Sequence, residues 1–95
     1  MNHKVGDKVI INSLEWFKAN CNLSNNGDYF HNTDRNLYLA KYKIPFCGEI
    51  LTIETMISNY GYYMEETGSY WWFDWMFDDS RKNVIEILRG NYIEL

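Results

Sequence analysis

Gly68-Ser69-Tyr70-Trp71-Trp72-Phe73-Asp74-Trp75-Met76-Phe77-Asp78-Asp79 is the most aromatic stretch of this 95-residue chain. It holds three of the four tryptophans, so any core that the protein builds has to include part of it. The alternation of a β-strand would place Tyr70 and Trp72 on one face and Trp71 and Phe73 on the other. An antiparallel sheet commonly covers only one of its faces. One aromatic pair is therefore either covered by another part of the chain or exposed as a binding surface.

Segments with strand-forming composition flank this stretch and are joined to it by short turns. Residues 49–58 are rich in β-branched side chains, and Asn59-Tyr60-Gly61 can make a tight connection to the next strand. Near the N-terminus, Gly6-Asp7 opens a second β-branched run. The strands expected are, in order, 5–13, 49–58, 62–67, 69–74 and 83–88, the last with a helix starting near Ser80 as its alternative. This order predicts a single mainly β domain over 1–95, a small SH3-like barrel of about five antiparallel strands.

Residues 14–47 are expected to form a long loop inserted between the first two strands. Ser13 is a good N-cap for a short helical turn that begins at Leu14. Residues 20–36 are crowded with Asn, Asp, Ser and Gly, which favour turns, and the Asn25-Asn26-Gly27-Asp28 segment could close a hairpin. Residues 37–44 suit either a short strand or a helical turn that ends at Pro45.

Composition indicates a folded protein, since 46% of the residues are hydrophobic and 18% are aromatic. No apolar run approaches the roughly 20 residues of a membrane span, and the N-terminal residues lack the apolar segment of a secretion signal. We therefore expect a cytoplasmic protein that does not enter a membrane.

The net charge of −4 is unevenly distributed. Residues 1–47 carry six basic and four acidic residues, whereas residues 48–95 carry three basic and nine acidic ones. The acidic, aromatic half would repel the phosphates of a nucleic acid. A protein partner with a basic surface is therefore expected in preference to a nucleic acid.

The residues that could carry chemistry are scattered along the chain. Cys21 and Cys47 stand 26 positions apart, a pattern that favours two reduced thiols and leaves a disulfide as the alternative. His3 and His31 are isolated from each other and from the cysteines, so no metal site is expected. Neither histidine belongs to a recognisable catalytic motif, and no phosphate-binding loop is present. We expect neither an enzyme nor a cofactor.

The aromatic residues of the second half exceed what one small core can hold. The core is assigned Met64, Tyr70, Trp72, Met76 and Phe77. The remaining aromatic residues and their acidic neighbours form the candidate binding site, which consists of Tyr60, Tyr63, Glu65, Trp71, Phe73, Asp74 and Trp75. Aromatic grooves of this kind bind proline-rich peptides or cations, and acidic neighbours favour a cation. A large exposed aromatic face would also suit a homodimer.

Three short motifs resemble small SH3-like barrel proteins encoded by phages and prophages of bacteria. They are Val5-Gly6-Asp7-Lys8-Val9, the Gly-x-x-x-Thr-Ile pattern of residues 48–53, and the Trp-x-Asp-x-Met-Phe pattern of residues 72–77. The resemblance covers roughly residues 4–13 and 48–79 and implies the fold more than an activity. Some phage proteins of this size inhibit host defence, so the resemblance implies a host or viral protein as the partner.

The leading hypothesis is a non-enzymatic module that binds a host or viral protein, as an inhibitor of host defence, through its acidic aromatic face or its long loop. The alternative is a small barrel that binds nucleic acid. It would use the lysines of the first half, with two tyrosines as stacking groups: Lys4, Lys8, Lys18, Lys41, Lys43, Tyr38 and Tyr42.

Overall fold

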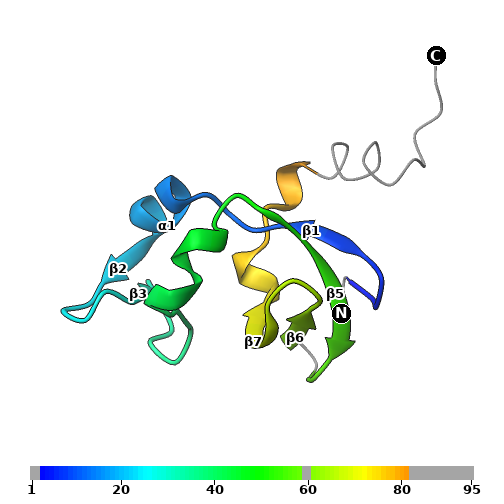
Figure 1. Cartoon of the computed structure of the whole chain (residues 1–95). Coiled ribbons are helices and arrows are strands. Elements are labelled where there is room, and N and C mark those ends of the chain that lie inside the picture. Colours follow the sequence, from blue (N-terminus) through cyan, green and yellow to red (C-terminus); the bar gives the residue numbers. More distant parts are fainter. Residues whose placement is uncertain (1–2, 59–60, 82–95) are drawn as a thin grey trace, which may run out of the picture. The chain divides into compact units, whose positions relative to one another are not determined.

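Strand pairing divides the chain into two units, each with its own antiparallel sheet (Figure 1). The computed structural model describes residues 3–58 and 61–81. Unit 1 comprises Met1–Ile11 and Ile50–Leu95, and unit 2 comprises Asn12–Glu49. The protein is therefore mainly β, as the sequence predicts. Neither sheet closes into a barrel among the strands described, and the fifth strand expected at 83–88 lies outside the described residues.

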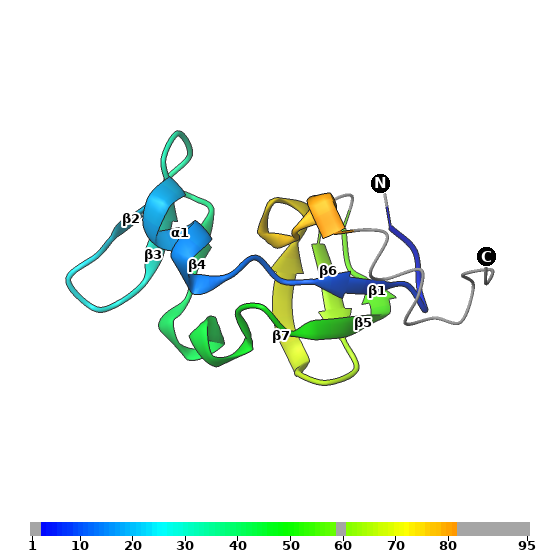
Figure 2. The ribbon, with the colours of Figure 1, turned by 90° about the horizontal axis from the view of Figure 1, so that it is seen from above.

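The sheet of unit 1 has four strands in the order β1-β5-β6-β7. Figure 2 shows these strands side by side, with β5, β6 and β7 following one another as a meander and β1 paired to the outer edge of β5. The elements of this unit are β1 (Lys8–Ile10), β5 (Ile50–Met56), β6 (Gly61–Met64), β7 (Gly68–Phe73), and the short 3-10 helices η2 (Asp74–Met76) and η3 (Asp79–Arg81). Each strand overlaps one of the ranges expected from the sequence.

The inner face of this sheet forms the core of unit 1. Tyr62 and Trp72 are cross-strand partners, as are Ile53 and Met64, and all four side chains are 0% exposed. Other buried apolar side chains of the unit are Val9, Ile10, Ile11, Leu51, Met76 and Phe77.

Tyr70 is the one residue assigned to the core from the sequence that is only half-buried. The register between β6 and β7 shifts between the pairs Tyr62–Trp72 and Met64–Gly68, which leaves more residues on β7 than on β6. Tyr70 lies in this irregular stretch, so simple alternation does not place it.

Unit 2 corrects the expectation of a long loop at 14–47. It consists of α1 (Leu14–Asn20), β2 (Cys21–Leu23), β3 (Tyr29–His31), β4 (Tyr38–Leu39) and the 3-10 helix η1 (Lys41–Phe46), with the strands in the order β2-β3-β4. The strands are only two or three residues long, so the turn residues between them outnumber them and the composition is that of a loop.

Local capping explains why unit 2 has regular structure. The Ser13 hydroxyl oxygen accepts a hydrogen bond from the Trp16 N–H at 3.1 Å, which caps α1 as predicted. Gly27 has a φ of 96°, and the Ser24 N–H donates to the Asp28 carbonyl at 2.8 Å, so this turn closes the hairpin between β2 and β3.

The core of unit 2 lies on one face of its sheet. Tyr29 and Leu39 are cross-strand partners and both are buried, as are Phe17 of α1 and Cys21 of β2. Alternation along β3 and β4 directs the neighbouring residues to the opposite face of the sheet.

The turn after β6 is fastened to β5 by one carboxylate. Glu66 accepts a hydrogen bond from the Thr52 N–H at 2.8 Å and another from the Thr52 hydroxyl at 2.9 Å. The Lys8 ammonium donates to the same hydroxyl oxygen at 2.9 Å. Partial burial would raise the pKa of Glu66, but these hydrogen bonds and the charge of Lys8 lower it overall. The ionised carboxylate therefore links the turn to β5, and the Thr52 hydroxyl links β5 to Lys8 of β1.

We predict that Glu66→Ala lowers the free energy of unfolding at pH 7 by roughly 1–2 kcal/mol, because two hydrogen bonds to a carboxylate are lost. Glu65→Ala removes the same charge from the adjacent exposed position and should change it by less than about 0.5 kcal/mol. Since the folded-state pKa of Glu66 is lowered, the stabilisation is present above the ordinary pKa of 4.5 and is lost as the pH falls through the lowered value. Urea denaturation of all three proteins between pH 7 and pH 3 measures this. A wild-type advantage over Glu66→Ala that does not change with pH would contradict the assignment.

Candidate functional site

Three aromatic side chains form a cluster on the outer face of β6 and β7. Because Tyr62 and Trp72 point into the core, their neighbours Tyr63, Trp71 and Phe73 point the other way. The ring centroids of Tyr63 and Trp71 are 6.3 Å apart at an interplanar angle of 75°, and those of Trp71 and Phe73 are 6.0 Å apart at 46°. Trp71 is 47% exposed, and the other two rings are half-buried. We call these three residues the aromatic face.

A glycine on the facing strand makes room for this cluster. Gly61 is the cross-strand partner of Phe73. A Cβ at Gly61 would lie 3.3 Å from a carbon of the Phe73 ring and 2.9 Å from the Ser58 hydroxyl oxygen. The absence of a side chain therefore allows the Phe73 ring to lie against the backbone of β6.

The structure brings together only part of the binding site expected from the sequence. Tyr63, Trp71 and Phe73 contact one another, and Glu65 is exposed in the turn that follows β6. Trp75 is half-buried in η2. The remaining aromatic candidate, Tyr60, lies outside the described residues.

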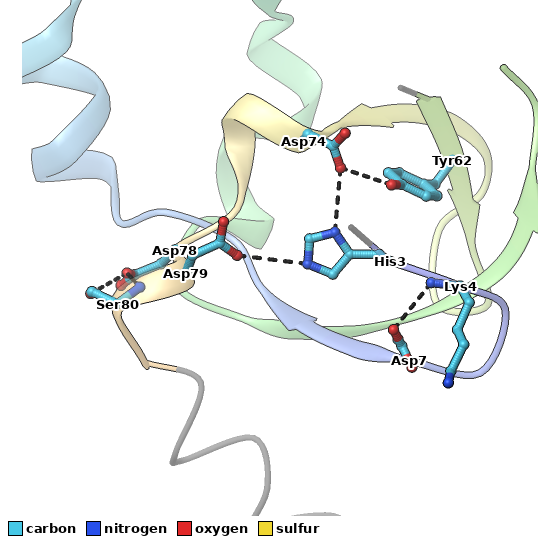
Figure 3. Close-up of polar contacts among 8 residues, drawn as sticks. All are labelled: His3, Lys4, Asp7, Tyr62, Asp74, Asp78, Asp79 and Ser80. Carbon is cyan, nitrogen blue, oxygen red and sulfur yellow. Dashed lines mark hydrogen bonds and ion pairs between the residues drawn. The ribbon is translucent and has the colours of Figure 1, made fainter. Parts of the chain in front are cut away.

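Asp74 takes part in a different group of side chains (Figure 3). Its carboxylate accepts a hydrogen bond from the Tyr62 hydroxyl at 2.8 Å, and the same oxygen lies 3.3 Å from Nδ1 of His3. Nε2 of His3 lies 3.6 Å from a carboxylate oxygen of Asp79. The His3 ring also packs edge-on against Tyr62 and Phe77. Since Tyr62 points into the core, this group belongs to the inner side of the sheet and not to the aromatic face.

The polar contacts around Tyr62 join segments that are far apart in the sequence. Burial, the hydrogen bond to Asp74, and the charges of Asp74, Asp7 and Asp79 all raise the pKa of Tyr62. The hydroxyl therefore stays protonated and serves as a hydrogen-bond donor. His3 and Asp74 are separated by 71 positions in the sequence, so no local motif reveals that they meet.

Neither cysteine is poised for reaction. Cys21 and Cys47 are both free thiols. Burial, together with the nearby Glu15 carboxylate, raises the pKa of Cys47 to about 11, and burial also raises the pKa of Cys21. Both thiols are therefore protonated at neutral pH, and the protonated form is a poor nucleophile and a poor metal ligand.

The part of the chain that the structure describes contains neither a cluster of metal ligands nor a helix that could cross a membrane. Within residues 3–58 and 61–81, no three His, Cys, Asp or Glu side chains lie together in a way that could hold a metal ion. The helices of these same residues are too short or too polar to cross a bilayer.

The lysines of the alternative nucleic-acid hypothesis are divided between the two units. Lys4 and Lys8 belong to unit 1, and Lys8 donates to Thr52. Lys18 and Lys41 are exposed in unit 2, whereas Lys43 is only 4% exposed. The buried Lys43 cannot serve as a phosphate contact. Of the two tyrosines expected to stack, Tyr38 is 43% exposed and Tyr42 is 54% exposed.

We predict that Tyr62→Phe lowers the free energy of unfolding by roughly 1–2 kcal/mol, because it removes a buried hydrogen bond to a carboxylate. Tyr63→Phe is the matched control, since it removes the same atom from the half-exposed neighbour on the other face, and it should cost less than about 0.5 kcal/mol. Chemical denaturation followed by circular dichroism measures both. Equal losses in the two variants would show that the Tyr62–Asp74 contact does not stabilise unit 1.

We predict a second effect, which depends on pH, at Lys43. Burial lowers its pKa from 10.5 to about 8, so between these values the unfolded state holds more protons than the folded state. Wild-type stability therefore carries a penalty below pH 8 that disappears as the pH rises towards 10.5. Lys43→Met should be more stable than wild type at pH 7, by roughly 3 kcal/mol at most, and should lose this advantage by about pH 10.

Lys41→Met, at an exposed position of the same helix, is the control for this measurement and should show no such dependence. Guanidinium denaturation curves recorded from pH 7 to pH 10 test the prediction. A Lys43→Met variant that is less stable than wild type at pH 7 and stays so at pH 10 would contradict it.

The chain was compared with family models, curated proteins and solved structures. No family model, curated protein or solved structure matches it. Its function is therefore inferred from its own residues.

Proposed function

We propose that this protein is a non-enzymatic protein-interaction module whose aromatic face binds a cationic segment of a protein partner. The observation that carries the proposal is Trp71, which is 47% exposed although it stands in the middle of a paired strand between Tyr63 and Phe73. Exposed tryptophan flanked by other aromatic side chains is the composition of binding hot spots.

Charge supports a cationic partner. The residues of unit 1 include five basic and nine acidic ones, so this unit carries the whole net charge of −4. Glu65 is exposed in the turn after β6, two positions from Tyr63. The faces of aromatic rings attract cations, and nearby carboxylates strengthen that attraction.

Rigidity supports the same proposal. The three rings stand on paired strands whose inner residues, Tyr62 and Trp72, are locked in the core. Side chains positioned in this way lose little conformational entropy when a ligand binds, so more of the contact energy is available for affinity. The aromatic face is therefore suited to anchor one or two side chains of a peptide.

The biological setting of the proposal comes from the sequence resemblance. An SH3-like barrel in unit 1 and a phage or prophage origin would make the partner a host or viral protein in a bacterial cytoplasm. Inhibition of a host defence protein is the role that such an origin implies.

The test uses a random dodecapeptide library displayed on phage, selected against wild-type protein and against Trp71→Ala. We expect wild type to enrich peptides that contain Lys or Arg. We expect the variant to lose this enrichment by about tenfold or more, since removal of a hot-spot tryptophan costs about 2 kcal/mol or more. Trp71→Ala should stay folded because the side chain is nearly half exposed, and circular dichroism checks this.

The matched control is Tyr38→Ala, which removes an exposed aromatic side chain from unit 2 and should leave the enrichment unchanged. Enrichment of the same peptides by Trp71→Ala would contradict the proposal, as would selection of acidic peptides. Dimerisation of wild type but not of Trp71→Ala, measured by light scattering, would instead make a second copy of this chain the occupant of the aromatic face.

A further inference from the structure

The outer face of the sheet in unit 2 carries a row of three side chains, one from each strand. Asn22 of β2, Phe30 of β3 and Tyr38 of β4 are cross-strand neighbours in register. The rings of Phe30 and Tyr38 are 5.2 Å apart and are inclined by only 31°. Tyr29 and Leu39, the adjacent residues on the same strands, are buried on the opposite face. The row therefore presents two rings that pack against one another at a tilt, and an amide, on the outer surface.

An arginine completes this surface. The guanidinium carbon of Arg35 lies 5.5 Å from the centroid of the Phe30 ring, within the range of a cation–π contact. Arg35 stands in the turn between β3 and β4, where Asp34 accepts hydrogen bonds from the N–H groups of Asn36 and Leu37, both at 3.0 Å. These bonds occupy the carboxylate and carbonyl of Asp34 and fix the turn that carries Arg35. We call Phe30, Tyr38 and Arg35 the stacking platform.

The charge around the stacking platform differs from that of the rest of the chain. Residues 29–43, which contain β3, β4 and the start of η1, hold the exposed cations Arg35 and Lys41, the buried Lys43, and a single carboxylate, that of Asp34. Unit 2 as a whole has four basic and four acidic residues, so the excess of negative charge lies entirely in unit 1. An anionic ligand therefore meets no net repulsion from the unit that carries the platform.

We propose that the stacking platform binds single-stranded nucleic acid. In this proposal an unpaired base stacks on the exposed ring of Tyr38, which packs against Phe30, and the Arg35 guanidinium beside Phe30 meets a backbone phosphate. A duplex keeps its bases stacked on one another and cannot offer one to an exposed aromatic ring, so single strands are the form that this surface fits. The proposal concerns the other sheet and does not depend on the aromatic face.

The experiment is fluorescence anisotropy with 15-nucleotide fluorescein-labelled oligo(dT), oligo(U) and a DNA duplex of about the same length, at several salt concentrations from 50 to 300 mM. The two single strands distinguish DNA from RNA as the source of the ligand. We expect both to bind more tightly than the duplex. Tyr38→Ala should weaken binding at least about fivefold, since base stacking on an aromatic side chain is worth about 1–3 kcal/mol. Arg35→Gln should reduce the slope of log K against log salt by about 0.7, the loss of one phosphate contact.

Matched controls keep the result specific. Tyr42→Ala removes another exposed tyrosine of unit 2 that lies outside the row, and Lys18→Gln removes a cation from α1; neither should change binding by more than about twofold. Trp71→Ala should leave oligonucleotide binding unchanged, so failure of this proposal and failure of the proposed function remain distinguishable.

The proposal would be overturned by no binding of either single strand at 50 mM salt, by equal affinity for the duplex, or by the same loss in Tyr42→Ala as in Tyr38→Ala. Circular dichroism confirms that Tyr38→Ala is folded, and Arg35→Gln, at an exposed position, provides an independent variant. Loss of peptide enrichment by Tyr38→Ala in the display experiment would make the platform a protein-docking surface, and that result would also refute the inference.

Discussion

The burial of Tyr62 against Trp72 is the constraint on which the rest of unit 1 depends. Both side chains are large and 0% exposed, and both carry a polar atom that must be satisfied inside the protein. The Tyr62 hydroxyl donates to Asp74, and the indole N–H of Trp72 donates to the Thr67 hydroxyl at 2.9 Å. Once this pair points inward, alternation turns Trp71 outward with its aromatic neighbours. The core and the candidate binding surface are thus two consequences of one register.

Polar contacts between distant segments hold this arrangement in place. The carboxylate of Glu66 joins the turn after β6 to Thr52 of β5, and Asp74 joins η2 to Tyr62 and to the N-terminal His3. In a chain of 95 residues the apolar core is small, so such charge-assisted hydrogen bonds account for a larger share of stability than they would in a larger domain. Glu66 and Asp74 are thus engaged in hydrogen bonds that hold the fold, whereas Glu65 is exposed in the turn after β6.

Much of the secondary structure follows from local signals. The β-branched residues of 49–58 and the aromatic run of 69–74 indicate strands, and Gly61 and Gly68 mark the places where those strands turn or begin. Ser13 predicts the helix that it caps, and the segment 25–28 forms the hairpin turn that its composition predicts. These features can be predicted from the sequence because each depends on residues within a few positions of one another.

Which side chains are buried and which are exposed cannot be predicted from local signals in this way. Trp71 and Trp72 are identical side chains at adjacent positions, and only the packing of β6 against β7 buries one and exposes the other. The sequence predicts that Asp74 is part of the binding site. In the structure it lies on the inner side of the sheet, next to His3, which is 71 positions away in the sequence. The sequence predicts that Lys43 is a surface cation, but the side chain is buried, and this burial lowers its pKa to about 8. Local propensity selects strands and turns from neighbouring residues, whereas burial and pairing arise from contacts between residues that the chain brings together from far apart.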